Sequence, residues 1–202
     1  MEIKKENLLN ALNTGSENVK ETILALFPEL KEETAQKAAN RPITERVKTF
    51  EDALNILGEE NQFVKEFRGM ITYAAEENCF PSWDMQAFLK LRIICAALNE
   101  GWQPEFSEDE WRYYPYFFLY TDEELSEKSD EWKNDRRLIS TGSYEVKGYA
   151  GLACANSSYV PSSSNATFGS LLCLKSDTLA SYCGKQFIEL WADFYLIRRD
   201  EE

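Results

Sequence analysis

The sequence predicts an α+β fold, in which a helical N-terminal part is followed by an antiparallel sheet of about four strands covered by a C-terminal helix. Apolar residues recur at helical spacing through the first hundred residues, and again from Asp177 to about Ile197. Between these parts the chain carries four short runs rich in apolar and aromatic residues. We therefore expect a helical region at residues 1–80 and an α+β domain at 81–202, or one continuous domain that includes both.

Paired start and stop signals predict the N-terminal helices. In "SENVKETILALFP", Ser16 is a candidate N-cap and the proline ends the helix. In "TFEDALNILG", Thr49 and Asp52 have the spacing of a capping box, and the glycine is a stop signal. "SWDMQAFLKLRIICAALNEG" predicts a strong helix with Ser82 as its cap. The short helices before it lack the basic face of a DNA reader, so we expect them to pack against other helices.

The densest aromatic stretch follows, with nine aromatic residues from Trp102 to Tyr120. It ends in "WRYYPYFFLY", a predicted strand. One side of this strand carries Tyr114, Tyr116, Phe118 and Tyr120. Pro115 has no backbone donor, which predicts an edge or a bulge at that position. Core packing is favoured for the phenylalanines. The tyrosines suit either the core boundary or an exposed platform for bases or sugars.

The rest of the chain completes the predicted sheet and its cover. Thr121 and Glu124 have the spacing of a second capping box, at the start of a short helical excursion. The runs "RRLIS", "YEVKGYAGLACA" and "TFGSLLCLKS" then predict strands. On the final helix, Ala180 and Gly184 form a small-residue notch, which predicts a close approach to the sheet.

Several chemistries are excluded by what the sequence lacks. It contains no histidine, which excludes the Ser-His-Asp triad, the Cys-His dyad and the histidine-based zinc motifs. No phosphate-binding glycine motif occurs. The five cysteines stand among apolar neighbours without a C-x-x-C pair, so we expect reduced core residues and no metal site. We predict no cofactor and no catalytic residue, although a carboxylate pair, a lysine or an activated Cys or Tyr would still allow an enzyme.

The formal net charge is −13, and its distribution is uneven. Residues 101–135 hold eleven acidic and three basic side chains. Such a chain is poorly suited to bind a phosphate backbone directly, so we expect no nucleic-acid partner. A solvated acidic face is the simpler interpretation of this segment. The more specific interpretation is an acidic surface that imitates nucleic acid and binds to a DNA-binding protein in its place.

A long polar stretch, "NSSYVPSSSNATFGS", joins two predicted strands from Asn156 to Ser170. It is too long for a tight hairpin turn, and long polar loops in compact domains often carry function. A plain connection is the alternative. If the loop binds a ligand, its candidate residues lie beside those of the aromatic strand. The predicted ligand-binding residues are Trp111, Tyr114, Tyr116, Tyr159, Ser162 and Asn165.

The succession of the motifs "ITERVKTFEDALNIL", "KLRIICAALNEGWQPEF", "YYPYFFLY" and "FGSLLCLKSDTLASYCGKQFIELWADF" resembles a family of proteins carried by phages and mobile elements of gut bacteria. The resemblance covers residues 42–57 and most of 88–196. It implies an accessory protein of a mobile element, used inside a bacterial cell. No function is assigned to that family, so the resemblance implies no site residue.

These observations favour a non-catalytic binding module that recognises a protein or a small polar ligand. An acidic DNA mimic that inhibits a DNA-binding enzyme and a histidine-independent carboxylate enzyme are the alternatives. No apolar run approaches the ~18 residues that suggest a membrane span. The N-terminus also has no signal-peptide core. We therefore expect a cytoplasmic protein without a membrane partner.

Overall fold

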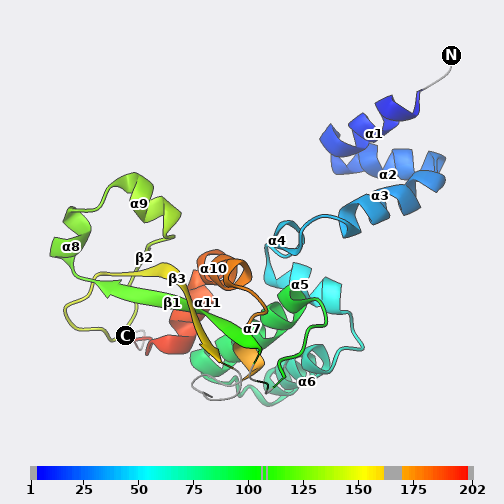
Figure 1. Ribbon diagram of the computed structural model, residues 1–202. Helices are drawn as coiled ribbons and strands as arrows, with labels where there is room; N and C mark the ends of the chain where they lie inside the picture. The colour runs from blue at the N-terminus through cyan, green and yellow to red at the C-terminus, as the bar shows by residue number, and fades with distance from the viewer. Residues whose placement is uncertain (1–3, 106, 108, 162–169, 200–202) are drawn as a thin grey trace. The chain divides into compact units, whose positions relative to one another are not determined.

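The computed structural model describes residues 4–105, 107, 109–161 and 170–199 (Figure 1). The chain forms two compact units, Met1–Arg46 and Val47–Glu202. The sequence-based division placed a boundary after residue 80, whereas the second unit also includes the two helices before that point.

The first unit is helical. It contains α1 (Lys5–Thr14), α2 (Glu17–Leu26), α3 (Glu29–Ala39) and α4 (Ile43–Arg46). Leu12, Ile23 and Leu30 are buried together between the first three helices. Helix α2 begins directly after Ser16, as predicted, although the Ser16 side chain makes no capping hydrogen bond.

The second unit begins with α5 (Phe50–Leu57), α6 (Gln62–Glu77) and α7 (Trp83–Asn99). The predicted capping box at the start of α5 is confirmed. The Asp52 backbone N–H donates to Thr49 Oγ1 over 3.1 Å, and the Thr49 N–H donates to Asp52 Oδ2 over 2.9 Å. Helix α7 is largely buried, and it packs against α5, α6 and the C-terminal helices.

In the described residues the sheet has three antiparallel strands, not about four. It contains β1 (Trp111–Tyr120), β2 (Ile139–Ser140) and β3 (Gly151–Pro161) in the order β1-β3-β2. The run expected to form a further strand instead makes the short 3-10 helix η1 (Ser170–Leu172) and a single bridge between Leu174 and Tyr113. A longer pairing is prevented because the chain enters a helix at Asp177, three residues after the bridge.

The prediction for Pro115 is confirmed. Strand β1 lies at the end of the described strand order, and its register with β3 shifts between Tyr116 and Phe117. Ala155 of β3 is the extra residue at this bulge, so alternation of side chains along β1 itself is not interrupted. Proline is tolerated here because an edge strand and a bulge both relax the demand for a ladder donor.

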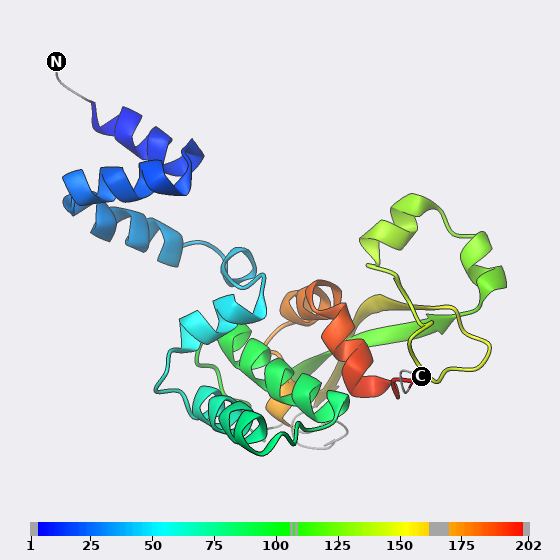
Figure 2. The same ribbon diagram turned by 180° about the vertical axis from the view of Figure 1, so that it is seen from behind.

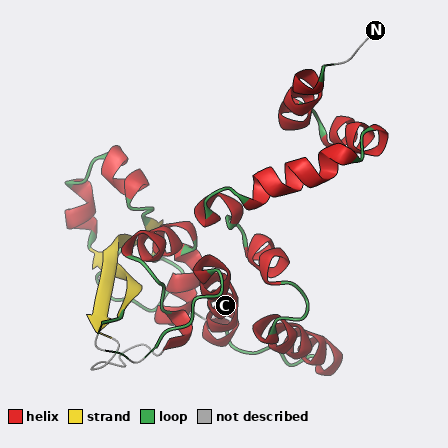
Figure 3. Ribbon diagram, turned by 45° about the vertical axis from the view of Figure 1, so that its right-hand side comes forward, coloured by secondary structure: helices red, strands yellow, loops and turns green. Residues whose placement is uncertain are grey.

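The expected C-terminal helix is divided into α10 (Asp177–Gln186) and α11 (Ile188–Tyr195). The division falls at Phe187, whose backbone angles of −118° and 33° are not helical. Helix α10 packs against β1 and β3, whereas α11 packs mainly against α7. Figure 3 shows most helices of this unit on one side of the yellow strands. The short helices α8 (Asp122–Ser126) and α9 (Asp130–Asp135) lie near the end of β1 (Figure 2), and α8 begins with the predicted Thr121–Glu124 capping box.

All five cysteines are free thiols, and four of them are buried in the core of the second unit. Cys79 is the exception to the predicted pattern, because it is exposed just after the end of α6. Among the buried thiols, Cys154 of β3 lies in the apolar cluster that joins the sheet to α11.

Helix α10 comes closest to the sheet at Gly184. A methyl group added at Gly184 would lie 2.8 Å from Cys154 Sγ and 2.8 Å from Pro115 Cβ. Both separations are shorter than van der Waals contact, so a residue with a side chain cannot keep this spacing. The close approach predicted from the small-residue notch is therefore confirmed at Gly184.

We expect Gly184→Ala to lower the free energy of unfolding by about 1–3 kcal/mol, because the added methyl overpacks the contact between α10 and the sheet. Gly69→Ala is the matched control: Gly69 lies exposed in α6, and an added Cβ there meets nothing within 4 Å. The control should be stabilised by roughly 0.5–1 kcal/mol, because alanine is the better helix former. Urea denaturation measures both changes, and the same effect at the two positions would contradict the proposed contact.

Candidate functional site

A cavity of about 410 Å³ opens where the start of β1, the end of β3 and the first residue of α10 meet. Five of the described residues line it: Trp111, Tyr113, Asn156, Ser157 and Asp177. We call it the Trp111 cavity. Its described lining combines two aromatic rings with a hydroxyl and a carboxylate, and Asn156 adds to its polar rim, which is the mixture of apolar surface and few polar groups that ligand sites have.

Strand alternation and pairing place these side chains. Trp111 and Tyr113 are two residues apart on β1 and therefore share a face. Ser157 is paired with Pro115, two residues further along, so it shares that face too. Three side chains from two neighbouring strands thus converge on one side of the sheet.

Asp177 is brought to the cavity by the start of α10. The Leu179 backbone N–H donates to Ser176 Oγ over 3.3 Å, which fixes Ser176 as the N-cap and Asp177 as the first helical residue. Ser157 Oγ donates a hydrogen bond to Asp177 Oδ1. This bond joins β3 to α10 and orients the carboxylate, which is the only charged group among the described lining residues.

The structure places the described members of the six predicted site residues in different surroundings. Trp111 lines the cavity with 43% of its surface exposed. Tyr114 is buried, with 3% exposed, and burial raises its pKa to about 12. Tyr116 is exposed but, five residues from Trp111, points to the opposite face. The Tyr159 backbone pairs with Tyr113. Ser162 and Asn165 lie outside the described residues.

The residues that sequence reasoning missed are Tyr113, Asn156, Ser157 and Asp177. Asn156 and Ser157 belong to the polar stretch that was singled out, but the stretch offered no reason to prefer them over its other serines and asparagines. Asp177 was identified only as the start of a helix. Its role depends on a contact with a residue twenty positions away, and no local pattern signals such a contact.

An aromatic row runs along the other face of β1. It is formed by Tyr116, Phe118 and Tyr120 of the strand and continues to Trp132 of α9. Successive ring centroids are 5.1, 6.3 and 5.2 Å apart, all in edge-to-face arrangements. Tyr116 and Phe118 are exposed by 45% and 47%, so the core position expected for Phe118 is wrong. Trp132 of α9 covers Tyr120, which makes this end of the row an intramolecular contact between α9 and β1.

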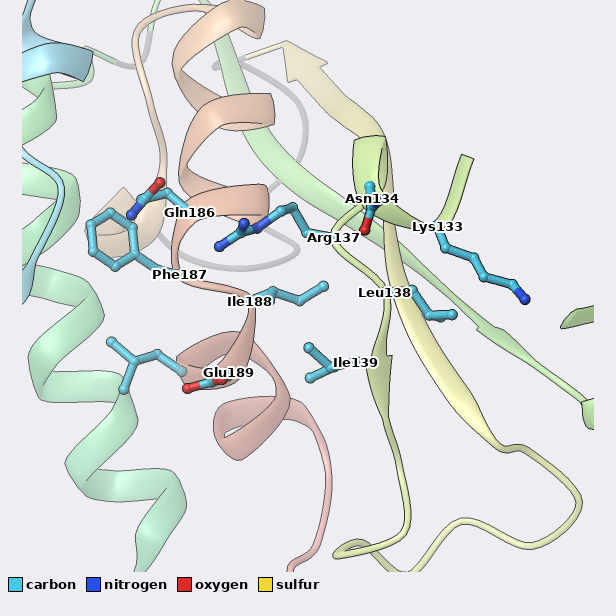
Figure 4. A pocket seen from close by; sticks show the side chains of 10 residues that line it. Lys133, Asn134, Arg137, Leu138, Ile139, Gln186, Phe187, Ile188 and Glu189 are labelled. Carbon is cyan, nitrogen blue, oxygen red and sulfur yellow. The ribbon is translucent and has the colours of Figure 1, made fainter. Parts of the chain in front are cut away.

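A larger cavity, of about 510 Å³, lies between the α9–β2 connection and the junction of α10 and α11 (Figure 4). Arg137 reaches across it toward Gln186, whereas Lys133 extends away from the junction. Gln186 is already engaged, because its Nε2 donates to the Lys48 carbonyl over 2.8 Å. Leu138, Ile139 and Ile188 supply apolar walls. Its described lining also has polar side chains at Lys133, Asn134 and Glu189. Its aromatic residue, Phe187, is buried, whereas the Trp111 cavity presents an exposed tryptophan beside its polar groups.

A third cavity, of about 360 Å³, contains two carboxylates, Asp84 and Asp193. Asp193 accepts hydrogen bonds from Arg198 Nε over 2.7 Å, from Arg198 Nη2 over 3.0 Å and from the Tyr144 hydroxyl over 2.8 Å. The pKa of Asp84 is lowered, first by a hydrogen bond from Ser82. A general acid needs a raised pKa, so Asp84 is not suited to be the acid of a catalytic couple, and Asp193 is engaged in its ion pair with Arg198.

The acidic residues of 101–135 fall into two groups. Among the described acidic residues, Glu105, Asp109 and Glu110 precede β1, and the others follow it in and around α8 and α9. A ten-residue strand separates the groups, which is roughly 30 Å at the usual rise per residue. A DNA mimic needs a continuous stripe of charge, and this arrangement does not favour one.

Comparison with protein-family models, curated proteins and solved structures finds no match for this chain. Within the described residues, no group of three or more Cys, Asp or Glu side chains is arranged to hold a metal ion. The described helices also include none with both the length and the apolar character needed to cross a membrane.

Two buried tyrosines predict how stability depends on alkaline pH. Burial raises the pKa of Tyr114 and of Tyr144 to about 12, and the hydrogen bond to Asp193 adds to the effect at Tyr144. Unfolded tyrosine titrates near ~10, so the unfolded state releases its protons first. The stabilisation is therefore complete below about pH 10, and it is lost as pH rises from about 10 to 12.

Tyr144→Phe should remove one late step from the tyrosinate absorbance titration. It should also lower stability at neutral pH by about 1 kcal/mol through the lost hydrogen bond. Denaturant unfolding at several pH values measures the predicted loss of stability with rising pH. An absorbance titration in which all tyrosines ionise together at about pH 10 would contradict the raised pKa values.

Proposed function

We propose that the protein is a non-catalytic binding module and that the Trp111 cavity is its ligand site. One observation carries this proposal. An exposed tryptophan, a tyrosine, a serine hydroxyl and a carboxylate converge from two strands and a helix on one concavity. Aromatic rings with a few oriented polar groups are suited to hold a ligand, and the described lining adds no second carboxylate, lysine or cysteine.

The construction of the site supports binding rather than catalysis. The carboxylate of Asp177 is held by Ser157, and the described lining residues include no second carboxylate, lysine or cysteine; their other titratable group is the phenol of Tyr113. Nucleophilic and acid–base mechanisms need two such groups within hydrogen-bonding reach. A rigid carboxylate beside aromatic rings instead offers a fixed point of recognition.

The ligand class that we propose is a protein segment or a small polar molecule. Free buried thiols at Cys95, Cys154, Cys173 and Cys183 support a reducing, cytoplasmic location. The context of a phage or mobile-element accessory protein rests on the resemblance of the sequence motifs alone.

A photo-crosslinking amino acid at position 111 tests this function in cells. We expect specific adducts from position 111, because a partner in the cavity lies against this side chain. The matched control is position 73, where Tyr73 is 63% exposed on α6, away from the cavity. Small ligands escape this test, so a mixture of neutral, cationic and anionic fragments is screened by NMR of fluorotryptophan-labelled protein. The site would be ruled out if the crosslinker at position 111 gave no adducts and no fragment shifted the Trp111 signal.

A further inference from the structure

We infer that the group recognised in the Trp111 cavity is an organic cation, either a guanidinium or an alkylammonium group. This inference rests on the proposed function and adds the chemistry of the ligand. The cavity offers a negative charge at Asp177 and the rings of Trp111 and Tyr113. Aromatic faces attract cations through the ring quadrupole, most strongly at tryptophan, and a neighbouring carboxylate acts in the same direction.

The cavity disfavours the opposite charge. None of its described lining residues is a lysine or arginine, so an anionic ligand would meet Asp177 with no positive group to offset it. Asp109 and Glu110 directly precede Trp111 and Arg112 follows it, so the acidic side chains outnumber the basic one there, and the whole chain has a net charge of −13. This field attracts cations toward the start of β1 and repels phosphates and carboxylates.

The same fold already uses this combination inside the third cavity. There the Arg198 guanidinium lies 4.2 Å from the centroid of Trp83 and forms a bidentate pair with Asp193. A tryptophan and an aspartate thus hold one arginine between them. The Trp111 cavity likewise places a tryptophan and an aspartate at one site, and its described lining includes no lysine or arginine.

Ser157 makes the carboxylate suited to this role. By donating to Asp177 Oδ1, it fixes the carboxylate plane relative to the sheet that carries the rings. Because the second oxygen, Oδ2, does not take part in that bond, it can accept from a ligand N–H. A guanidinium or ammonium group has only donors, and it matches an acceptor beside an aromatic face.

Three defined probes test the inference on the full-length protein. They are a hexapeptide of alternating glycine and arginine, the same peptide with neutral citrulline in place of arginine, and methylguanidinium chloride. Binding is followed by ¹⁹F NMR of fluorotryptophan-labelled protein, in which Trp111→Phe identifies the Trp111 signal. We expect the arginine peptide to shift this signal and the citrulline peptide to bind at least about fivefold more weakly.

Asp177→Asn should weaken binding of the arginine peptide by a similar factor, since it removes the charge while the amide oxygen still accepts from Ser157. Its control is Glu76→Gln, which makes the same charge change at an exposed residue of α6 and should alter binding less than about twofold. Thermal unfolding confirms that both variants are folded. Methylguanidinium that binds as tightly as the peptide identifies a free cation as the ligand, whereas tighter peptide binding identifies a protein side chain.

Equal binding of the arginine and citrulline peptides, or equal effects of the two substitutions, would overturn the cation assignment. So would the absence of any shift with the two cationic probes. The proposed function is still supported after these outcomes if the crosslinker at position 111 yields adducts or the Trp111 signal responds to another fragment. Failure of the cation chemistry is thereby distinguished from failure of the site.

Discussion

The contact between α10 and the sheet at Gly184 determines where the candidate site lies. Since no side chain fits between the helix and Cys154, the helix axis is held at a fixed distance from β1 and β3. Asp177 precedes Gly184 by two helical turns, or about 10 Å along the axis. The position of the carboxylate beside Ser157 therefore follows from a packing constraint in the core, and the hydrogen bond between the two residues completes it.

The sequence contained the local signals of this fold but not the tertiary contacts. Both capping boxes, at Thr49 and Thr121, were predictable because each depends only on residues three positions apart. Pro115 was predictable because a missing backbone donor restricts any strand. The break at Phe187 was not, because the helical period continues through it. The reduction of the fourth strand to one bridge at Leu174 was also hidden, since apolar runs of that length look alike in strands and in buried turns.

In the candidate site, too, local features were predictable from the sequence and tertiary contacts were not. Alternation along β1 was known from the sequence, so Trp111 and Tyr116 belong to opposite faces by simple counting. Which face is covered, and how far along the strand, depends on the helices that pack against it. Tyr114 and Tyr116 share a face, yet one is buried and the other exposed. Periodicity cannot separate two such residues, because the difference arises from the ends of neighbouring elements rather than from the strand itself.

Energetics favour a protein segment over a free amine as the source of the cation. A cation–π contact at an exposed site contributes about 0.5–1 kcal/mol, rising to about 2 when water is excluded. A solvent-exposed ion pair adds about 0–1 kcal/mol. Together they supply roughly 0.5–3 kcal/mol, whereas a dissociation constant of 1 mM requires about 4 kcal/mol. The remainder has to come from contact area outside the cavity, which a protein segment offers and a small ammonium ion does not. The Trp111 cavity would then select which side chain is accepted, while the surface around it would set the affinity.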